Sequence, residues 1–167
     1  MRIAVGSDHR GVRTRSSLVE LLGRLGQDVV DVGTHAHGDC DYPDIAEIVA
    51  RKVASGEVDR GILICGSGFG MCIVANKVPG VRAAPCHDEL TAELSRRHND
   101  LNVLCLASGL VSETLLGRMV EIWLKTPFEG GRHARRVQKI AQFECQNGQR
   151  PTFGNGVARE TGEQPAS

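Results

Sequence analysis

The 167-residue sequence lacks several features that mark specialised classes of protein. Its twenty basic and twenty acidic side chains cancel to a formal net charge of zero. A chain without a global field has no general attraction for nucleic acid or an anionic membrane, so a small local ligand is favoured. No apolar run approaches the length of a membrane span, and the chain opens as a strand instead of a signal peptide. We therefore expect a cytoplasmic protein with neither a nucleic-acid nor a membrane partner.

The six cysteines show no Cys-x-x-Cys pair and no spacing typical of metal ligands. Most stand in apolar runs, so we interpret them as reduced thiols. The sequence contains no internal repeat, and its 41% hydrophobic content is enough for one domain with a sizeable core. Polar residues, glycine and proline dominate after Cys145. We expect a single domain over 1–145 and a mobile tail over 146–167.

Strand and helix patterns alternate along the chain. Strands are expected at 2–6, 28–33, 61–64, 81–86 and 102–106, and helices at 12–25, 43–55, 71–77, 89–97, 110–125 and 132–145. The alternation predicts an α/β fold, a parallel sheet covered on both faces with right-handed crossovers. The expected strand order is 2-1-3-4-5. On the last helix, Val137, Ile140, Ala141 and Phe143 are expected to be buried.

A strand, a glycine loop and a helix start follow one another in the middle of the chain. Residues 61–64 are a short apolar run, typical of a strand buried on both faces, and Cys65 stands at its carboxyl end. Gly66, Gly68 and Gly70 allow the backbone to bend tightly and to approach a ligand closely. Loop amides before a helix attract anions, and the same positive field favours a thiolate. The stretch predicts a base or nucleophile facing an oxyanion hole.

Three further polar clusters could join Cys65 if the topology brings them together. They are Asp8-His9, His98-Asn99-Asp100, and Arg132-His133 with Arg135-Arg136. Asp8-His9 and Cys65 follow the first and third strands, which flank the switch point of the predicted sheet, where ligands bind. Arg132 and Arg136 lie four apart on one helical face, an arrangement that suits a phosphate clamp.

Each cluster also has a purely structural interpretation. Cys65 could be a small buried residue, and Asp8 could cap the first helix. His98 could complement a helix dipole, with Asn99 in the left-handed turn. The paired arginines could be a solvated stripe. Taken singly, each structural interpretation is at least as good as the functional one, but together the clusters favour a site.

Nucleotide binding is the second interpretation of the glycine loop. The loop resembles a dinucleotide-binding fingerprint, but it follows the third strand and lacks the Gly-x-Gly-x-x-Gly spacing. Lys77 comes too late to be a phosphate-loop lysine. A binding module of this kind would need the loop and the arginines but not the thiol of Cys65.

Taken together, the sequence resembles the type B ribose-5-phosphate isomerases and the wider family that includes galactose-6-phosphate isomerase subunits. The resemblance runs from Met1 to about Cys145. It rests on five ordered blocks: residues 6–9, 41–44, 61–70 with 75–77, 97–100 with 102–104, and 129–133 with Arg136. Five blocks in order are far more specific than any one of them.

The resemblance implies a Rossmann-like αβα sandwich that forms a homodimer or a dimer of dimers, with sites at the subunit interface. It implies no metal and no nucleotide cofactor. The implied reaction interconverts ribose 5-phosphate and ribulose 5-phosphate through a cis-enediol, a step of carbohydrate metabolism in the pentose phosphate pathway. A four- or six-carbon sugar phosphate remains an alternative substrate, because the pocket length cannot be read from the sequence.

The resemblance also implies a role for each site residue. Cys65 is the base that moves a proton between C1 and C2, and Ser67 assists at the oxygen. The loop amides, those of Gly66, Gly68, Phe69 and Gly70, hold the enediolate. His98 opens the furanose ring while Asp8 holds ring hydroxyls. The substrate is further bound by Asn99 and, at its phosphate, by His9, Arg132 and Arg136, with His133 adjacent.

This sequence departs from the family at one place. Many relatives carry an arginine shortly after the strand that ends near Leu106, where this chain has Ala107-Ser108-Gly109. Small residues are usual at the position of Arg10, so we hypothesise that Arg10 supplies the missing charge.

Overall fold

The computed structural model describes residues 1–33 and 40–146, and within these ranges no helix is both long and apolar enough to cross a lipid bilayer. The strands are β1 (Arg2–Ser7), β2 (Asp28–Asp31), β3 (Arg60–Cys65), β4 (Ala83–Pro85) and β5 (Val103–Ala107). The helices are α1 (Val12–Arg24), α2 (Tyr42–Ala54), α3 (Phe69–Ala75), α4 (Glu89–Asn99), α5 (Glu113–Lys125) and α6 (Arg132–Gln146). The predicted tail lies outside the described residues from 147 on.

The sheet is parallel throughout, as predicted, but its order is β2-β1-β3-β5-β4 and not 2-1-3-4-5. The place beside β3 goes to β5, whose five residues are all buried. β4 has three half-buried residues and ends on Pro85, which has no N–H to donate to a neighbouring strand. The predicted order of the last two strands is therefore wrong. The physical reason is that a short strand that ends in proline suits the edge of a sheet.

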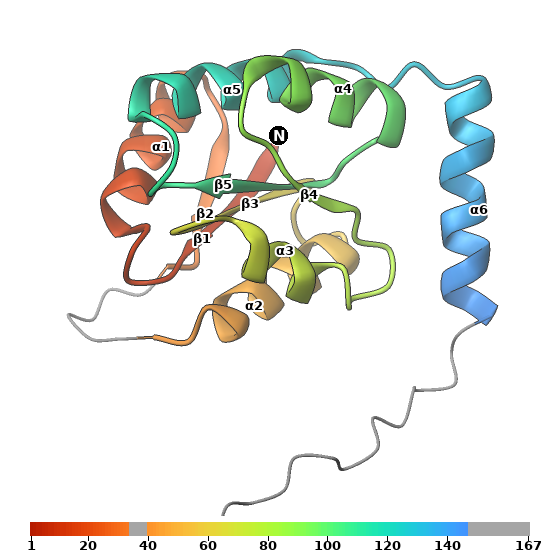
Figure 1. The fold of residues 1–167 in the computed structure, drawn as a ribbon, viewed down its shortest axis with the longest axis horizontal. Coiled ribbons are helices and arrows are strands. Elements are labelled where there is room, and N and C mark those ends of the chain that lie inside the picture. Colours follow the sequence, from red (N-terminus) through yellow and green to blue (C-terminus); the bar gives the residue numbers. More distant parts are fainter. Residues whose placement is uncertain (34–39, 147–167) are drawn as a thin grey trace, which may run out of the picture.

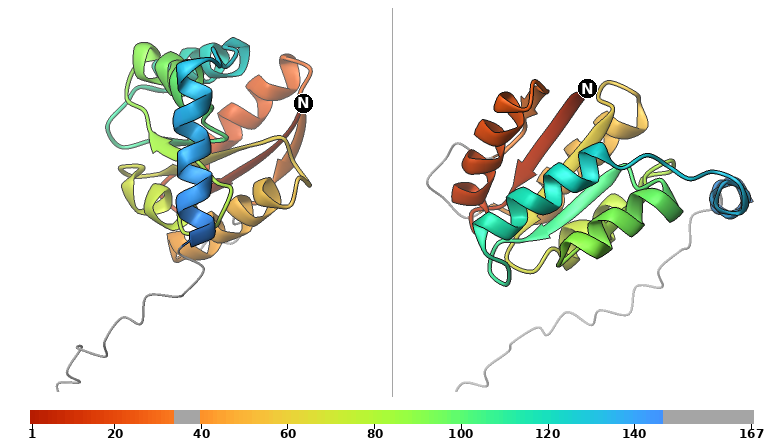
Figure 2. Two further views of the ribbon diagram at one scale, coloured as in Figure 1. Left: turned by 90° about the vertical axis from the view of Figure 1, so that its right-hand side faces the viewer. Right: turned by 90° about the horizontal axis from the view of Figure 1, so that it is seen from above.

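Helices cover both faces of the sheet (Figures 1 and 2). Because side chains alternate along a strand, Ile62 and Ile64 point to one face and Leu63 and Cys65 to the other. The first face packs against α1, α4 and α5, and its core includes the fully buried Trp123. The second face packs against α2 and α3. This is the αβα sandwich that the sequence predicts.

The ends of α4 determine where two of the predicted site residues lie. Asp88 caps the helix, and its carboxylate accepts a hydrogen bond from the Thr91 N–H at 2.7 Å. The helix ends at Asp100, whose φ is 46°, so this residue and not Asn99 takes the left-handed conformation. His98 and Asn99 therefore belong to the last turn of α4.

Helix α6 stands apart from the sandwich (Figures 1 and 2). The described residues leave its apolar face uncovered, because Ile140 is 43% and Phe143 65% exposed, and Ala141 is exposed as well. Val137 is half-buried, and His133 is the one buried residue of the helix. The predicted burial of this face is therefore wrong for a single chain. An apolar stripe at helical spacing must be covered by something, but the spacing does not say by which chain.

Candidate active site

Cys65 ends β3 at the point where the chain turns into the glycine loop. It is 5% exposed, and its sulfur accepts a hydrogen bond from the Gly68 N–H at 3.1 Å. This hydrogen bond fixes the position of the sulfur at the start of the glycine loop. All six cysteines are free thiols, as predicted. Burial raises the pKa of Cys86 to about 11, so that thiol stays protonated at neutral pH.

The glycine loop is held in place by neighbouring elements. The Ser108 N–H and hydroxyl both donate to the Cys65 carbonyl, at 2.9 and 3.1 Å. The Tyr42 ring lies so close to Gly70 that a Cβ there would be 2.7 Å from it. Gly68 has a φ of 79°, a conformation that costs a residue with a Cβ about 1–2 kcal/mol. The loop is therefore built before any ligand arrives, which is what a preorganised oxyanion site needs.

The turn after β1 lies beside this loop. The Asp8 N–H donates to the Ile64 carbonyl at 3.3 Å, which ties the turn to β3. The buried Asp8 carboxylate accepts from the amides of Arg10 and Gly11, at 2.9 and 3.1 Å. Asp8 therefore stabilises the turn. It is not the N-cap residue of α1, because that residue is Gly11. The Arg10 guanidinium lies against Gly66, with its Cζ 2.9 Å from where a Cβ would be.

These residues form what we call the carboxyl-edge group: residues 8–10 and 65–70. β1 and β3 are neighbours in the sheet, at the point where the strand order reverses. The sequence predicts this juxtaposition, and the fold has it. His9 and Phe69 are exposed and Ser67 is half-buried, so part of the group is open to a ligand.

The remaining predicted site residues lie at the opposite edge of the sheet. We call them the amino-edge group, and they are His98, Asn99, Arg132, His133 and Arg136. A crossover helix runs antiparallel to its strands, so the last turn of α4 lies near the amino end of β5. Cys65 is in register with Ala107, at the carboxyl end of β5. The amino end of β5 lies about 13 Å from there along the strand. The four polar clusters therefore do not converge within one chain, and the site at a subunit interface that the resemblance implies stays a prediction.

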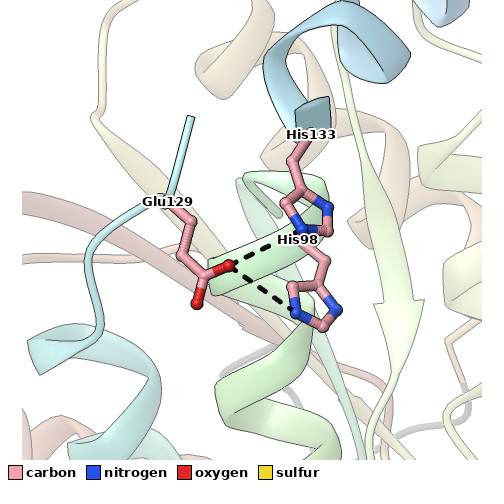
Figure 3. Close-up of side chains that lie close together, drawn as sticks. All are labelled: His98, Glu129 and His133. Carbon is pink, nitrogen blue, oxygen red and sulfur yellow. Dashed lines mark ion pairs between the residues drawn. The ribbon is translucent and has the colours of Figure 1, made fainter. Parts of the chain in front are cut away.

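Two stacked imidazoles dominate the amino-edge group (Figure 3). The rings of His98 and His133 are 4.3 Å apart between centroids, with 2° between their planes. The Glu129 Oε2 faces both, at 3.9 Å from the His98 Nε2 and 3.6 Å from the His133 Nε2. Burial and then the nearby His98 and Arg132 lower the pKa of His133, so this imidazole is neutral at neutral pH. Arg97 pairs with Glu129 and lowers the pKa of its carboxyl.

The trio of His98, Glu129 and His133 offers ligand atoms within 4.8 Å of one another, a donor set that transition metals use. Its surroundings disfavour a metal ion. A metal bonds in the plane of an imidazole ring, and two parallel stacked rings share no such plane. The carboxylate is already paired with Arg97, and Arg132 adds positive charge beside His133. The cluster suits an anion better than a cation.

The start of α6 adds cations and a hollow to this edge. The Arg132 Nε donates to the His133 Nε2 at 3.3 Å, and both Arg132 and Arg136 are exposed. Asn99 lines a hollow of about 340 Å³ together with Ile140 and Phe143 of α6. The sequence alone predicts no role for Glu129 or Arg97, although both lie within the blocks that resemble the family. Their partnership spans 32 residues, and no local spacing reveals it.

A model of the family described as Ribose/Galactose Isomerase matches residues 3–140. The chain belongs to this family. It is 46% identical to ribose-5-phosphate isomerase B of Escherichia coli over 86% of this chain and 96% of that protein. It is 38% identical to D-erythrulose-4-phosphate isomerase of Pectobacterium atrosepticum over 87% of this chain and 97% of that protein.

Solved structures of this isomerase family have the same fold. Ribose-5-phosphate isomerase B of Clostridium thermocellum matches with a TM-score of 0.86 and 48% identity, over 88% of this chain and 99% of that one. The Mycoplasma genitalium enzyme, solved with bound ribulose-5-phosphate, matches with a TM-score of 0.84 and 44% identity, over 87% and 97% of the two chains. The resemblance to type B ribose-5-phosphate isomerases is confirmed.

Proposed function

We propose that this chain is an aldose–ketose isomerase that interconverts ribose 5-phosphate and ribulose 5-phosphate. Its family supports the class of reaction, and several relatives are named for this substrate. The observation that carries the proposal is the Cys65 sulfur, held 3.1 Å from the Gly68 N–H at the start of the glycine loop. A thiolate can remove a proton from the carbon beside a carbonyl only if the developing oxyanion is stabilised in place. The loop amides supply that stabilisation.

The proton balance of the reaction is complete without a redox partner. The Cys65 thiolate takes the proton from C2 of the open aldose, the C–H electrons form the C1–C2 double bond, and O1 becomes negative. Amides of residues 66–70 stabilise this charge. The thiol then returns the proton to C1, and the hydroxyl proton of O2 passes to O1 with Ser67 as the relay. C2 is left as the carbonyl of the ketose.

The other predicted residues bind and prepare the sugar in this scheme. His98 opens the furanose ring by general acid–base action, and Asp8 holds hydroxyl groups beside the glycine loop. Asn99 binds the substrate near the reacting carbons. The phosphate is bound by His9, Arg132 and Arg136, with His133 adjacent. Arg10 adds a further cation, because its guanidinium lies over the loop at Gly66.

We infer that a complete site needs two copies of the chain, as a homodimer or as a dimer of dimers. The base stands at one edge of the sheet and the ring-opening histidine at the other. The uncovered stripe of α6, with Ile140 and Phe143 exposed, borders the hollow that Asn99 lines. A second copy seated on this stripe would cover apolar surface and bring its own carboxyl-edge group toward His98 and Arg132.

Isomerisation of a panel of four-, five- and six-carbon sugar phosphates by the wild type and by Cys65→Ala tests the proposal. We expect ribose 5-phosphate to be the best substrate and the variant to lose kcat by orders of magnitude with little change in KM. Preference for a four-carbon substrate would favour the second candidate, an erythrulose phosphate isomerase, which the Pectobacterium relative supports. A Cys65→Ala variant that keeps full function would instead support a non-catalytic sugar-phosphate or nucleotide-binding module.

A further inference from the structure

We propose that Glu129, held by Arg97, is a positioning residue that fixes the orientation of His98 and the nitrogen on which His98 carries its proton. This inference rests on the proposed function, in which His98 opens the sugar ring. It assigns a role to a side chain that the mechanism above leaves unused. Glu129 lies in the connection between α5 and α6 and faces the last turn of α4 (Figure 3).

Glu129 is attached to α4 at two points, both on the same residue. Its backbone N–H donates to the Arg97 carbonyl at 3.1 Å. Its side-chain Oε1 accepts from the Arg97 Nε at 2.6 Å. An arginine that holds a carboxylate in this way fixes its geometry as well as its charge. The second oxygen, Oε2, is thereby directed to the imidazoles.

The Oε2 atom faces the Nε2 atoms of both histidines, as the two dashed lines in Figure 3 show. A carboxylate opposite one ring nitrogen favours a proton on that nitrogen, which leaves the other nitrogen to exchange protons with a ligand. For His98 this makes Nδ1 the atom that works on the sugar, whereas the His133 Nε2 accepts a hydrogen bond from the Arg132 Nε and so carries no proton. The distance of 3.9 Å between the His98 Nε2 and the Glu129 Oε2 is longer than a hydrogen bond. The two atoms therefore interact either through one bridging water or directly, once substrate binding shortens the distance.

His133 supports the His98 ring from one of its faces. Its buried imidazole stacks face to face on His98 and is neutral, because burial lowers its pKa. A neutral ring can stack on His98 while His98 gains and loses a proton, without charge repulsion between the two. The stacking restricts rotation of the His98 ring, and Glu129 then selects the nitrogen that faces the substrate.

Ring opening needs a defined nitrogen because two oxygens exchange protons during one step. The anomeric hydroxyl loses its proton, the bond between C1 and the ring oxygen breaks, and the ring oxygen gains a proton. C1 becomes the aldehyde carbon, and no net proton is consumed. A His98 ring that can turn freely presents the wrong nitrogen for part of the time, which slows this step but not the later transfer at Cys65.

The test measures ring opening apart from isomerisation. In a Cys65→Ala background, the exchange between the furanose and aldehyde forms of ribose 5-phosphate labelled with ¹³C at C1 can be followed by NMR saturation transfer. We expect Glu129→Gln to slow this exchange about tenfold, and in the enzyme with Cys65 to lower kcat by a similar factor with KM within twofold. Glu129→Asp, which keeps the charge on a shorter side chain, should retain more of the rate than Glu129→Gln.

Glu93→Gln is the matched control. Glu93 is the other carboxylate on Arg97, with its Oε1 3.0 Å from the Arg97 Nη1, and among the described residues it forms no ion pair with an imidazole. This variant should open the ring at the parental rate. Equal rates in Glu129→Gln and the parent, or equal losses in Glu129→Gln and Glu93→Gln, would overturn the inference. Full isomerase activity in Cys65→Ala alone would overturn the proposed function instead.

Discussion

A mixture of two inactive variants should recover activity if each site takes Cys65 from one copy and His98 from the other. Cys65→Ala removes the base, and His98→Ala removes the ring-opening group, so each variant alone has two damaged sites per dimer. In a mixed dimer, one site carries both defects and the other carries neither. We expect Cys65 and His98 to come from different copies because they lie at opposite edges of the sheet, which are about 13 Å apart along β5.

The expected recovery follows from counting. Random exchange of subunits at equal concentration makes about half of the dimers mixed, and each mixed dimer has one intact site of two, so about a quarter of the wild-type activity should return. Each parent should lie far below this value, because loss of a general acid–base group costs roughly 10²–10⁴ in rate. The signal therefore exceeds its background by more than tenfold.

The assay co-expresses the two variants with different affinity tags and measures turnover of ribose 5-phosphate. Native mass spectrometry gives the fraction of mixed dimers, and doubly purified mixed dimers should have about half of the wild-type activity. A verified population of mixed dimers with no more activity than either parent would refute the shared site. Both groups would then have to act within one chain, against the separation that the sheet imposes.

Three further substitutions test the roles of individual residues. Arg10→Ala should raise KM for ribose 5-phosphate roughly tenfold, since a charged hydrogen bond contributes about 1.5–3 kcal/mol. Arg13→Ala, on the exposed side of α1, should leave KM unchanged. Equal KM values for Arg10→Ala and the wild type would show that Arg10 does not bind the phosphate. Gly68→Ala and Gly80→Ala both place a Cβ at positive φ and should lower Tm similarly, but only the change at Gly68 should also lower kcat; matched kcat losses would contradict a special role for the loop. The hydrogen bond from the Thr91 amide lowers the pKa of Asp88, so the stability that the cap contributes is present above the ordinary carboxyl pKa and is lost as pH falls through the lowered value. Asp88→Ala should therefore lower Tm at pH 7 and much less at pH 2. A difference in Tm that does not depend on pH would contradict the cap.

The local elements of this fold could be predicted from the sequence because each carries its own signal. A run such as Ile62-Leu63-Ile64 is buried on both faces of a sheet wherever it lies, and Asp88 caps a helix through contacts within four residues. The carboxyl-edge group was predictable as well, because the carboxyl ends of adjacent parallel strands lie at the same edge of the sheet.

The errors concern relations between distant parts of the chain. The order of β4 and β5 depends on which strand buries more of its residues, and β4, which is half-buried and ends on Pro85, takes the edge. The spacing of Ile140 and Phe143 identifies an apolar stripe but not the chain that covers it. Whether His98 meets Cys65 within one chain or across a subunit interface also depends on such a relation, because a crossover helix returns the last turn of α4 to the opposite edge.

The transfer of hydrogen from carbon by Cys65 can be measured directly with ribose 5-phosphate that carries deuterium at C2. Wild-type enzyme in ordinary water should release this deuterium into the solvent during turnover, because the thiol that receives it exchanges before returning a proton to C1. Cys65→Ala should bind the sugar phosphate with similar affinity and release no deuterium above the rate without enzyme. Release by the variant at the wild-type rate would contradict the account, because another group would then be the base.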